Sequence, residues 1–403
     1  MNILIISNSI PYPPSDGDKI RNFELIKRLG REHKIGLVGF VNSDHDIKNA
    51  GPLKEFCDFV EPVVFEEDYK SLLKRAKRAF AYLVRGEPLY NRWTWSADMA
   101  KKITEIVNKR HFDIIQFEHS YMASYIYSLN GKKSAAVLTL HNIEALKFKT
   151  MFKIEPFSLD KLRFFLNALM YKNWEPKIAD KFVQSVTMSD DDAQALKRKM
   201  PGLRIQAIPN GVDTKSIRPL SLNKDSKTLL FVGKMTYQPN RDAAIYFCRR
   251  ILPLIKKRVS GVKVLLVGNN SSPEISDLAS FDIEVLGLLP RQDLARYYED
   301  SAMTIVPLRA GSGTRFKILE SMAYKRPVVS TSIGCEGLGV RNRQNILIAD
   351  KPQDFAGAVI ELLSDPGLRE EISENACRLV RQKYDWDVIA ENLITLYRGI
   401  IKQ

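Results

Sequence analysis

Residues 303–323 of this chain read MTIVPLRAGSGTRFKILESMA. Met303–Val306 is a short apolar run rich in β-branched residues, and Phe316–Tyr324 carries apolar residues at helical spacing. Two glycines between them free the backbone to turn and to approach a ligand closely. An apolar strand, a glycine loop and a helix in this order are the unit of a parallel α/β sheet. The stretch therefore predicts a doubly wound domain whose ligand lies beyond the carboxyl ends of the strands.

The same alternation of short apolar runs and helical segments extends in both directions along the 403 residues. In the first half the predicted strands are Ile3–Ser7, Ile35–Phe40, Val60–Phe65, Asp113–Phe117, Ala136–Leu140 and Phe182–Met188. In the second half they are Leu229–Val232, Val262–Val267, Ile283–Leu286, Met303–Val306, Val328–Ser330 and Ile346–Ile348. The segment Arg204–Asp213 and the polar stretch Ser221–Ser226 separate the two sets. We therefore expect an α/β protein with two doubly wound, Rossmann-like domains, residues 1–205 and 206–386.

Composition and charge narrow the classes of partner. The chain is 45 % hydrophobic and 27 % charged, as globular proteins are, and its net charge of +14 favours an anionic partner. The basic residues are spread over both halves and form no recognised nucleic-acid module, so nucleic acid is not expected as a partner. The four cysteines form no C-x-x-C pair, which argues against a zinc site and favours a reducing compartment. No signal peptide or membrane span is predicted, so we expect a cytoplasmic protein.

The glycine loop within residues 311–320 is a candidate anion site. The backbone N–H groups of Gly313, Thr314 and Arg315 would open the following helix, where phosphate binds well. Arg315 adds a bidentate phosphate donor, and Glu320 can accept hydrogen bonds from a vicinal diol such as a ribose. The structural alternative is a glycine-rich turn, with Glu320 merely favouring the helix N-terminus.

Two further strand ends in the second domain carry glycine. Gly233 is followed by Lys234, and Arg241 opens the next helix, while Gly287 and Leu288 follow the strand Ile283–Leu286. Each alone could be a simple turn. Three glycine loops in one domain, two of them with a basic residue, predict a pocket for a nucleotide diphosphate.

The first domain is marked by acidic, basic and histidine residues at strand ends. The turn Pro11–Arg21 delivers Asp16, Lys19 and Arg21 to the sheet edge. His119 and His141 each follow a predicted strand. A single histidine at a strand end is usually a structural group, but two at the carboxyl edge of one sheet favour a role in an active site.

These residues resemble the retaining nucleotide-sugar glycosyltransferases of GT-B fold, group 1 or family 4, over nearly the whole chain. Within that family the chain is similar to the sugar transferases associated with exosortase (PEP-CTERM) and exopolysaccharide loci, through Pro11–Arg21, Phe231–Asp242 and Gly311–Ala323. The resemblance implies an acceptor-side N-terminal domain and a donor-side C-terminal domain facing each other across a cleft. It also implies that the C-terminal helix, residues 387–403, crosses back onto the N-terminal domain.

The resemblance also assigns roles to individual residues. Gly313, Thr314 and Arg315 would hold the donor diphosphate, and Lys234 would match the family's basic residue after the first glycine of that domain. Glu320 would match the ribose-binding second glutamate of the E-x7-E motif, and His141 the histidine near the transferred sugar.

Two departures from the family pattern concern the donor. Ser312 stands where the first glutamate of E-x7-E would contact the donor sugar. A second diphosphate lysine, expected several residues after Lys234, has no clear counterpart, and Arg241 and Arg315 are the possible substitutes.

The expected activity is transfer of a sugar from a UDP- or GDP-sugar to a lipid-linked or polysaccharide acceptor in cell-surface polysaccharide biosynthesis, without cofactor or metal. Negative charge that develops on the leaving diphosphate would be stabilised by fixed cations and a helix N-terminus. Asp190–Asp192 and Asp385–Asp387 match the metal-binding Asp-x-Asp spacing, but the first follows Ser189 as a helix cap would and the second lies at a helix junction. The alternatives are a sugar-nucleotide epimerase of the same fold and a non-catalytic nucleotide-sugar-binding protein.

Two segments could contact a membrane. Lys70–Arg85 is a basic stretch with apolar residues on one helical face, which could bind the anionic inner face of the plasma membrane or pack against its own domain. Phe148–Trp174 mixes aromatic residues with lysines, and could cover a lipid-like acceptor or pack inward.

Overall fold

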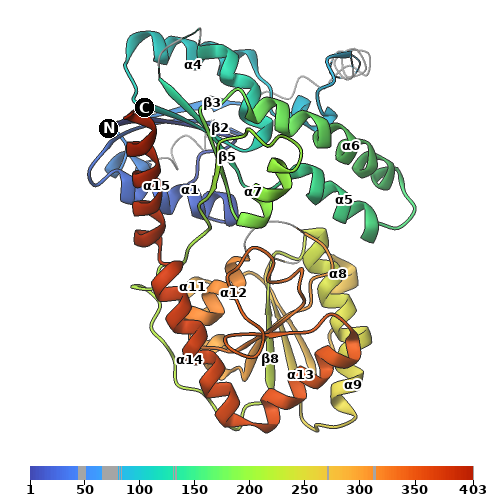
Figure 1. Ribbon diagram of the computed structural model, residues 1–403. Helices are drawn as coiled ribbons and strands as arrows, with labels where there is room; N and C mark the ends of the chain where they lie inside the picture. The colour runs from blue at the N-terminus through green and yellow to red at the C-terminus, as the bar shows by residue number, and fades with distance from the viewer. Residues whose placement is uncertain are drawn as a thin grey trace. The chain divides into compact units, whose positions relative to one another are not determined.

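The computed structural model describes residues 1–43, 51–65, 80, 82, 84–129, 131, 134–269, 272–311 and 315–402. The chain divides into two compact units (Figure 1). The first comprises Met1–Phe152, Phe157–Pro209 and Ile389–Gln403, and the second comprises Lys153–Pro156 and Asn210–Val388. Each unit has its own hydrophobic core.

The first unit is built on a parallel sheet of seven strands in the order β3-β2-β1-β4-β5-β6-β7. The strands are β1 (Asn2–Ser7), β2 (Lys34–Val41), β3 (Phe59–Val64), β4 (Ile114–Glu118), β5 (Ala135–Leu140), β6 (Gln184–Thr187) and β7 (Ile205–Ala207). Six of them follow the predicted apolar runs. The seventh, β7, pairs with β6 inside the segment that the sequence assigned to the domain linker. Its sequence, Ile205-Gln206-Ala207, has an exposed glutamine in the middle, so no continuous apolar run revealed it.

Helices follow the strands of the first unit, and short polar side chains begin several of them. They are α1 (Gly17–Leu29), η1 (Gly51–Glu55), η2 (Leu89–Trp93), α4 (Ala97–Lys109), η3 (Ser120–Leu129), α5 (Glu144–Ile154), α6 (Leu159–Ala179) and α7 (Asp190–Lys197). Ser189 accepts a hydrogen bond from the Asp192 backbone N–H at the start of α7. This contact confirms the interpretation of Asp190–Asp192 as a capped first turn.

The second unit contains a parallel sheet of six strands in the order β10-β9-β8-β11-β12-β13. The strands are β8 (Thr228–Val232), β9 (Lys263–Val267), β10 (Ile283–Leu286), β11 (Met303–Val306), β12 (Val328–Ser330) and β13 (Leu347–Ile348). The helices are α8 (Gln238–Tyr246), α9 (Leu252–Lys256), α10 (Pro273–Ser276), α11 (Arg291–Asp300), α12 (Phe316–Ala323), α13 (Pro352–Ser364) and α14 (Pro366–Lys383), and a π-turn, η4 (Phe247–Ile251), joins α8 to α9. Two doubly wound parallel sheets are therefore confirmed.

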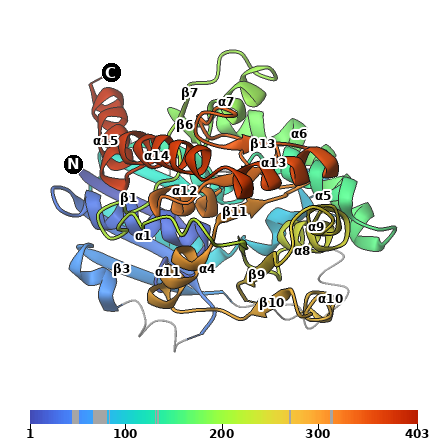
Figure 2. The same cartoon turned by 90° about the horizontal axis from the view of Figure 1, so that it is seen from below.

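The C-terminal helix, α15 (Trp386–Ile401), starts in the second unit and belongs to the first from Ile389 onward. It lies beside α1 in both views (Figures 1 and 2). At its start the carboxylate of Asp385 accepts a hydrogen bond from the Thr214 backbone at 3.2 Å, and Asp387 pairs with Lys215 at 2.5 Å. Both carboxylates of this Asp-x-Asp match are thus tied to their own unit.

The structure also bears on the state of the cysteines and on the expectation that no helix spans a membrane. All four cysteines are buried and free. Within the described part of the chain, none of the helices combines the length and the hydropathy that crossing a bilayer requires.

Candidate active site

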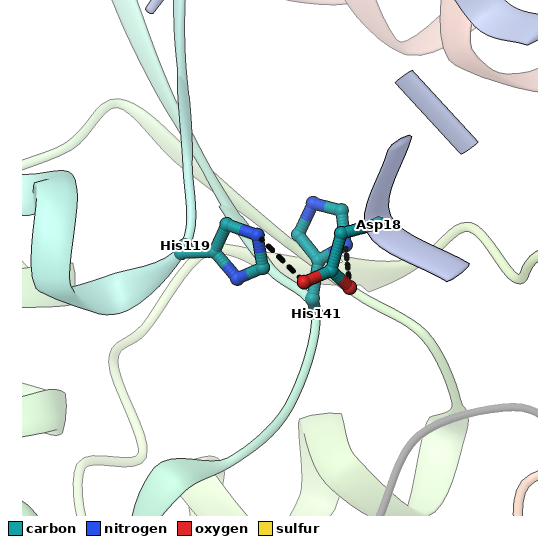
Figure 3. A group of neighbouring side chains, drawn as sticks. All are labelled: Asp18, His119 and His141. Carbon is teal, nitrogen blue, oxygen red and sulfur yellow. Dashed lines mark ion pairs between the residues drawn. The ribbon is translucent and has the colours of Figure 1, made fainter. Parts of the chain in front are cut away.

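Two histidines meet at the carboxyl edge of the first sheet. Strands β4 and β5 are parallel neighbours, with Glu118 opposite Thr139, so the residues that follow both strands lie side by side. The His119 and His141 rings stack with their centroids 4.0 Å apart (Figure 3). Both side chains are almost fully buried. His119 has a φ of 76°, a left-handed conformation that costs a non-glycine residue about 1–2 kcal/mol and that surrounding contacts must offset.

A carboxylate from α1 joins the two histidines (Figure 3). Asp18 Oδ2 lies 3.3 Å from His119 Nε2, and Asp18 Oδ1 lies 3.5 Å from His141 Nδ1. The side chain of Asp18 keeps 43 % of its surface exposed, so the carboxylate also faces solvent and can receive a ligand. These three residues are called the Asp18–His119–His141 cluster below.

Asp16, the acidic residue predicted from the sequence to belong to the site, is instead the N-cap of α1. Its carboxylate caps α1 by accepting a hydrogen bond from the Lys19 backbone N–H at 3.2 Å. Lys19 itself is partly exposed on the first turn of α1. Arg21 is buried and donates hydrogen bonds to the backbone carbonyls of Pro209 and Ile208, at 2.8 and 3.0 Å. The structure therefore brings His119 and His141 together with Asp18, and assigns Asp16 and Arg21 to holding the chain around them.

The two histidines hold protons differently. Burial lowers the pKa of His141, but hydrogen bonds to Asp18 and Glu118 outweigh it and raise this pKa to about 9. His141 Nε2 lies 2.5 Å from Glu118 Oε2, which is also buried. For His119, burial and the charge of His141 both lower the pKa well below the ordinary value. Burial would raise the pKa of Asp18, but the two histidines hold it well below its usual range. At neutral pH the cluster is thus a carboxylate, an imidazolium and a neutral imidazole.

Such a cluster suits hydroxyl-rich ligands. A carboxylate can accept hydrogen bonds from hydroxyl groups, and the imidazolium holds this carboxylate ionised and oriented. One ligand atom from each residue lies within 4.8 Å of the others, and a carboxylate behind a histidine is also found at metal sites. A divalent cation would first have to displace the His141 proton, which the raised pKa of about 9 opposes.

A second carboxylate supports the segment after β5. Glu175, on α6, accepts hydrogen bonds from the backbone N–H groups of Glu144 and Ala145, at 2.9 and 3.1 Å. Burial, followed by the charge of Glu144, raises the pKa of Glu175 to about 8. This contact fixes the start of α5, three residues after His141.

In the second unit, glycines bring the ends of two strands together. Gly233 follows β8 and Gly268 follows β9. Gly268 has a φ of 144°, and a Cβ built on it would lie 1.9 Å from the Gly233 carbonyl oxygen. Only glycine allows this approach, so the two loops present backbone rather than side chains at the carboxyl edge of the sheet.

A lysine that the sequence did not single out lies directly at this edge. Lys317, in the first turn of α12, places its Nζ 2.8 Å from Asn240 Oδ1 and 4.5 Å from the centre of the Phe231 ring. A Cβ on Gly233 would lie 2.8 Å from this ammonium. Burial, followed by the charge of Arg315, lowers the pKa of Lys317 to about 7.

Asn240 connects Lys317 to the loop that follows β8. It is six residues after Lys234, and its Nδ2 donates to the Lys234 carbonyl at 3.0 Å. Its Oδ1 accepts from Lys317. Through Asn240, the Lys317 side chain of α12 is therefore linked to the backbone of Lys234.

Arg315 and Glu320 flank the same edge. Arg315 is the N-cap of α12 and is 8 % exposed, and a Cβ on Gly311 would lie 2.9 Å from its Nη2. Glu320, three residues after Lys317, accepts a hydrogen bond from the Tyr298 hydroxyl at 3.3 Å and remains partly exposed.

The remaining residues predicted to bind the donor lie in the loops after β8 and β10 and at the start of α8, or outside the described residues. Lys234 is exposed beside Gly233, and Arg241 pairs with Glu274 of α10 at 3.3 Å. Gly287 accepts a hydrogen bond from the Gly268 N–H, and Leu288 is exposed next to it. Ser312, Gly313 and Thr314 lie outside the described residues.

Comparison with known proteins agrees with this division. The model of Glycosyltransferase Family 4 matches residues 58–216, and that of Glycosyl transferases group 1 matches residues 226–365. The chain thus combines two glycosyltransferase domains. The first matched region lies mainly in the first unit, and the second lies entirely in the second unit.

Relatives extend the match along the chain. A Klebsiella pneumoniae protein named "Uncharacterized 44.6 kDa protein in cps region" is 24 % identical over 396 residues, covering 95 % of this chain and 96 % of that protein. The D-inositol 3-phosphate glycosyltransferase of Acidothermus cellulolyticus is 29 % identical over 222 residues, but the match covers only 50 % of this chain and 49 % of that enzyme.

Solved structures share the fold at low identity. Sucrose-phosphate synthase from Thermosynechococcus elongatus superposes with a TM-score of 0.72 at 16 % identity, covering 100 % of both chains. Anabaena HepE, solved in complex with UDP-glucose, has a TM-score of 0.68 at 14 % identity, covering 99 % of this chain and 100 % of its own. The architecture is therefore GT-B, two Rossmann-like domains, as the sequence predicted.

Proposed function

We propose that this protein transfers a sugar from a UDP- or GDP-sugar to a lipid-linked or polysaccharide acceptor, with retention and without a metal ion, in exopolysaccharide biosynthesis. The relative in a Klebsiella cps region and the HepE complex with UDP-glucose support the pathway class and the donor class. Within the family we place it with the exosortase-associated transferases, on the motifs in Pro11–Arg21 and Gly311–Ala323.

The observation that carries the proposal is the set of cations at the carboxyl edge of the second sheet. Lys317 lies against Gly233, Lys234 extends from the same loop, and Arg315 lies over Gly311. Cations beside exposed backbone match the shape and charge of a diphosphate. In this proposal Glu320 of α12, which accepts a hydrogen bond from Tyr298, also accepts hydrogen bonds from the ribose diol.

In the proposed reaction, the acceptor oxygen bonds to the anomeric carbon as the bond from that carbon to the diphosphate oxygen breaks. The bonding electron pair leaves with the diphosphate, whose growing negative charge Lys317, Arg315 and Lys234 stabilise. The acceptor hydroxyl proton passes to the departing phosphate oxygen. The Asp18–His119–His141 cluster binds sugar hydroxyl groups through the Asp18 carboxylate.

The test starts with calorimetric titration of the purified protein against UDP-, GDP- and ADP-sugars. The donor that binds is then incubated with a membrane extract as acceptor source, and release of nucleoside diphosphate is measured. We expect release that requires the extract. Conversion of one sugar nucleotide into another without extract would indicate an epimerase, and binding without any turnover would indicate a non-catalytic module. NMR spectroscopy of the product gives the anomeric configuration of the new glycosidic bond, which tests whether transfer proceeds with retention.

A further inference from the structure

The outward face of α6 is apolar, although it faces solvent. Five large apolar side chains on this helix are between 40 and 76 % exposed: Leu159, Leu162, Phe165, Leu166 and Leu169. Phe157, just before the helix, is fully exposed. Isolated exposed apolar residues are common, but six within 13 consecutive positions form a patch that indicates a binding surface.

These residues form one stripe along the helix. At 3.6 residues per turn, the five side chains fall within about 120° of the helix circumference. The opposite face packs into the first unit through buried residues that include Tyr171, Trp174 and Ile178. Packing within the fold therefore does not require the stripe to be apolar. We call the five helix residues and Phe157 the α6 stripe.

Basic residues border the α6 stripe. On the same circumference, Lys161 and Lys172 fall along one margin, and Arg163 falls along the other, where it pairs with Asp160 at 2.7 Å. Lys161 also lies over the Phe152 ring of α5, 5.2 Å from its centre, and Phe152 contacts Phe165. Helices α5 and α6 pack side by side as a hairpin (Figure 1). An apolar stripe with cationic margins is the pattern of a helix that lies in a membrane interface, where lysine stems extend along the apolar surface toward lipid phosphates.

We propose that the α6 stripe docks this protein onto an anionic phospholipid membrane. The occupant follows from charge complementarity. A second copy of the chain would bring its own net charge of +14 and its own basic margins against these, whereas an anionic bilayer offers hydrocarbon to the stripe and phosphates to the lysines. The proposal concerns a surface of the first unit and does not depend on the transfer reaction.

This surface differs from the one predicted in the sequence. Most of Lys70–Arg85 lies outside the described residues, so its proposed membrane contact remains a prediction. Of its few described residues, Phe80 and Val84 are exposed, whereas Phe148–Trp174 is described throughout and shows a continuous set of apolar side chains that face outward.

The experiment is co-sedimentation with vesicles of phosphatidylcholine, with and without about one-third phosphatidylglycerol. The first variant combines Leu162→Gln, Leu166→Gln and Leu169→Gln. The second variant is Phe157→Gln, and its matched control is Phe281→Gln. Both phenylalanines are fully exposed, but only Phe157 belongs to the α6 stripe. All these side chains are exposed, so melting temperatures should stay at the wild-type value and serve as the folding control.

A second pair tests the charges. One basic residue near an anionic surface contributes about 1 kcal/mol, so Lys161→Gln with Lys172→Gln should lower the partition coefficient about 30-fold. The matched control replaces two exposed lysines of α4, Lys101→Gln with Lys109→Gln, and should sediment like the wild type.

The expected result is that the wild-type protein sediments with the anionic vesicles, less so at high salt, and that the triple leucine variant, Phe157→Gln and the Lys161/Lys172 variant lose most of this binding. Wild-type protein that stays in the supernatant overturns the proposal, as does undiminished sedimentation of the triple variant. A wild-type dimer in analytical ultracentrifugation that the triple variant converts to monomer also overturns it, by assigning the stripe to a contact between copies.

Discussion

Replacement of Lys317 by glutamine isolates the charge that we assign to the donor diphosphate. The glutamine amide can still donate to Asn240 Oδ1, so the loop after β8 keeps its anchor while the ammonium beside Gly233 is removed. A hydrogen bond to a charged group contributes about 1.5–3 kcal/mol. We therefore expect Lys317→Gln to weaken binding of the nucleotide sugar by about 2 kcal/mol, or roughly 30-fold in Kd.

The lowered pKa of Lys317 adds a second signature. In the free protein this pKa is about 7, and a bound diphosphate raises it, because the anion favours the charged lysine. Binding at pH 7 should therefore take up about half a proton, and wild-type affinity should fall about tenfold between pH 6 and pH 8. UDP-glucose is the suitable probe, because its two phosphates are esterified and do not titrate in this range.

Calorimetry in buffers of different ionisation enthalpy measures both affinity and proton uptake. The matched control is Lys257→Gln, an exposed lysine at the end of α9. Lys317→Gln with wild-type affinity and wild-type proton uptake would refute the assignment of Lys317 to the diphosphate. Wild-type protein that binds no nucleotide sugar would instead contradict the proposed function itself.

Four further outcomes are expected. Arg315→Ala should weaken nucleotide binding by about 2 kcal/mol in calorimetry. Glu320→Ala should discriminate less between ribose and deoxyribose donors in the same assay. Unchanged binding in both variants would show that this edge of the second sheet is not the donor site. Transfer should persist in EDTA, and loss of activity restored by one divalent ion would point to the Asp18–His119–His141 cluster as a metal site. Asp18→Asn should lower transfer strongly, while Asp16→Asn, which preserves a capping side chain, should leave it near wild type; equal loss in both would mean that α1 only needs its cap. The pKa of His141 is raised from 6.5 to about 9, so its stabilisation is complete below pH 6.5 and is lost as pH rises through 9. The melting temperature should fall across this window and His141→Gln should flatten the profile; parallel profiles would exclude His141 as the source.

The sequence predicted the strands better than the contacts between them. Twelve strands were visible because buried parallel strands are short apolar runs. In β7 an exposed glutamine separates Ile205 from Ala207, and the place of this strand depends on pairing with β6. His119 and His141 could be predicted to approach each other, since both follow strands of one sheet.

The remaining site residues depended on side-chain direction. Asp16 and Asp18 are equivalent in the sequence, and only the start of α1 at Gly17 makes one a cap and directs the other to the histidines. Lys317 follows a glycine loop as any helix lysine might, and its contact with Asn240 joins residues 77 positions apart. No spacing rule within one loop could reveal that pair, because the spacing is set by the distance between α12 and α8 in space.

The passage of α15 into the first unit has a consequence for how this chain folds during synthesis. Apart from Lys153–Pro156, the second unit is the continuous stretch Asn210–Val388, whereas the first unit also includes Ile389–Gln403. Ile389, Leu393 and Tyr397 are almost fully buried, so the surface that receives them is left uncovered until they arrive. On the ribosome the first unit emerges first and is completed last. A nascent chain whose α14 has emerged while Ile389–Gln403 is still inside the ribosome would therefore carry a complete second unit together with a first unit that exposes an apolar surface, the state in which chaperone binding and aggregation compete.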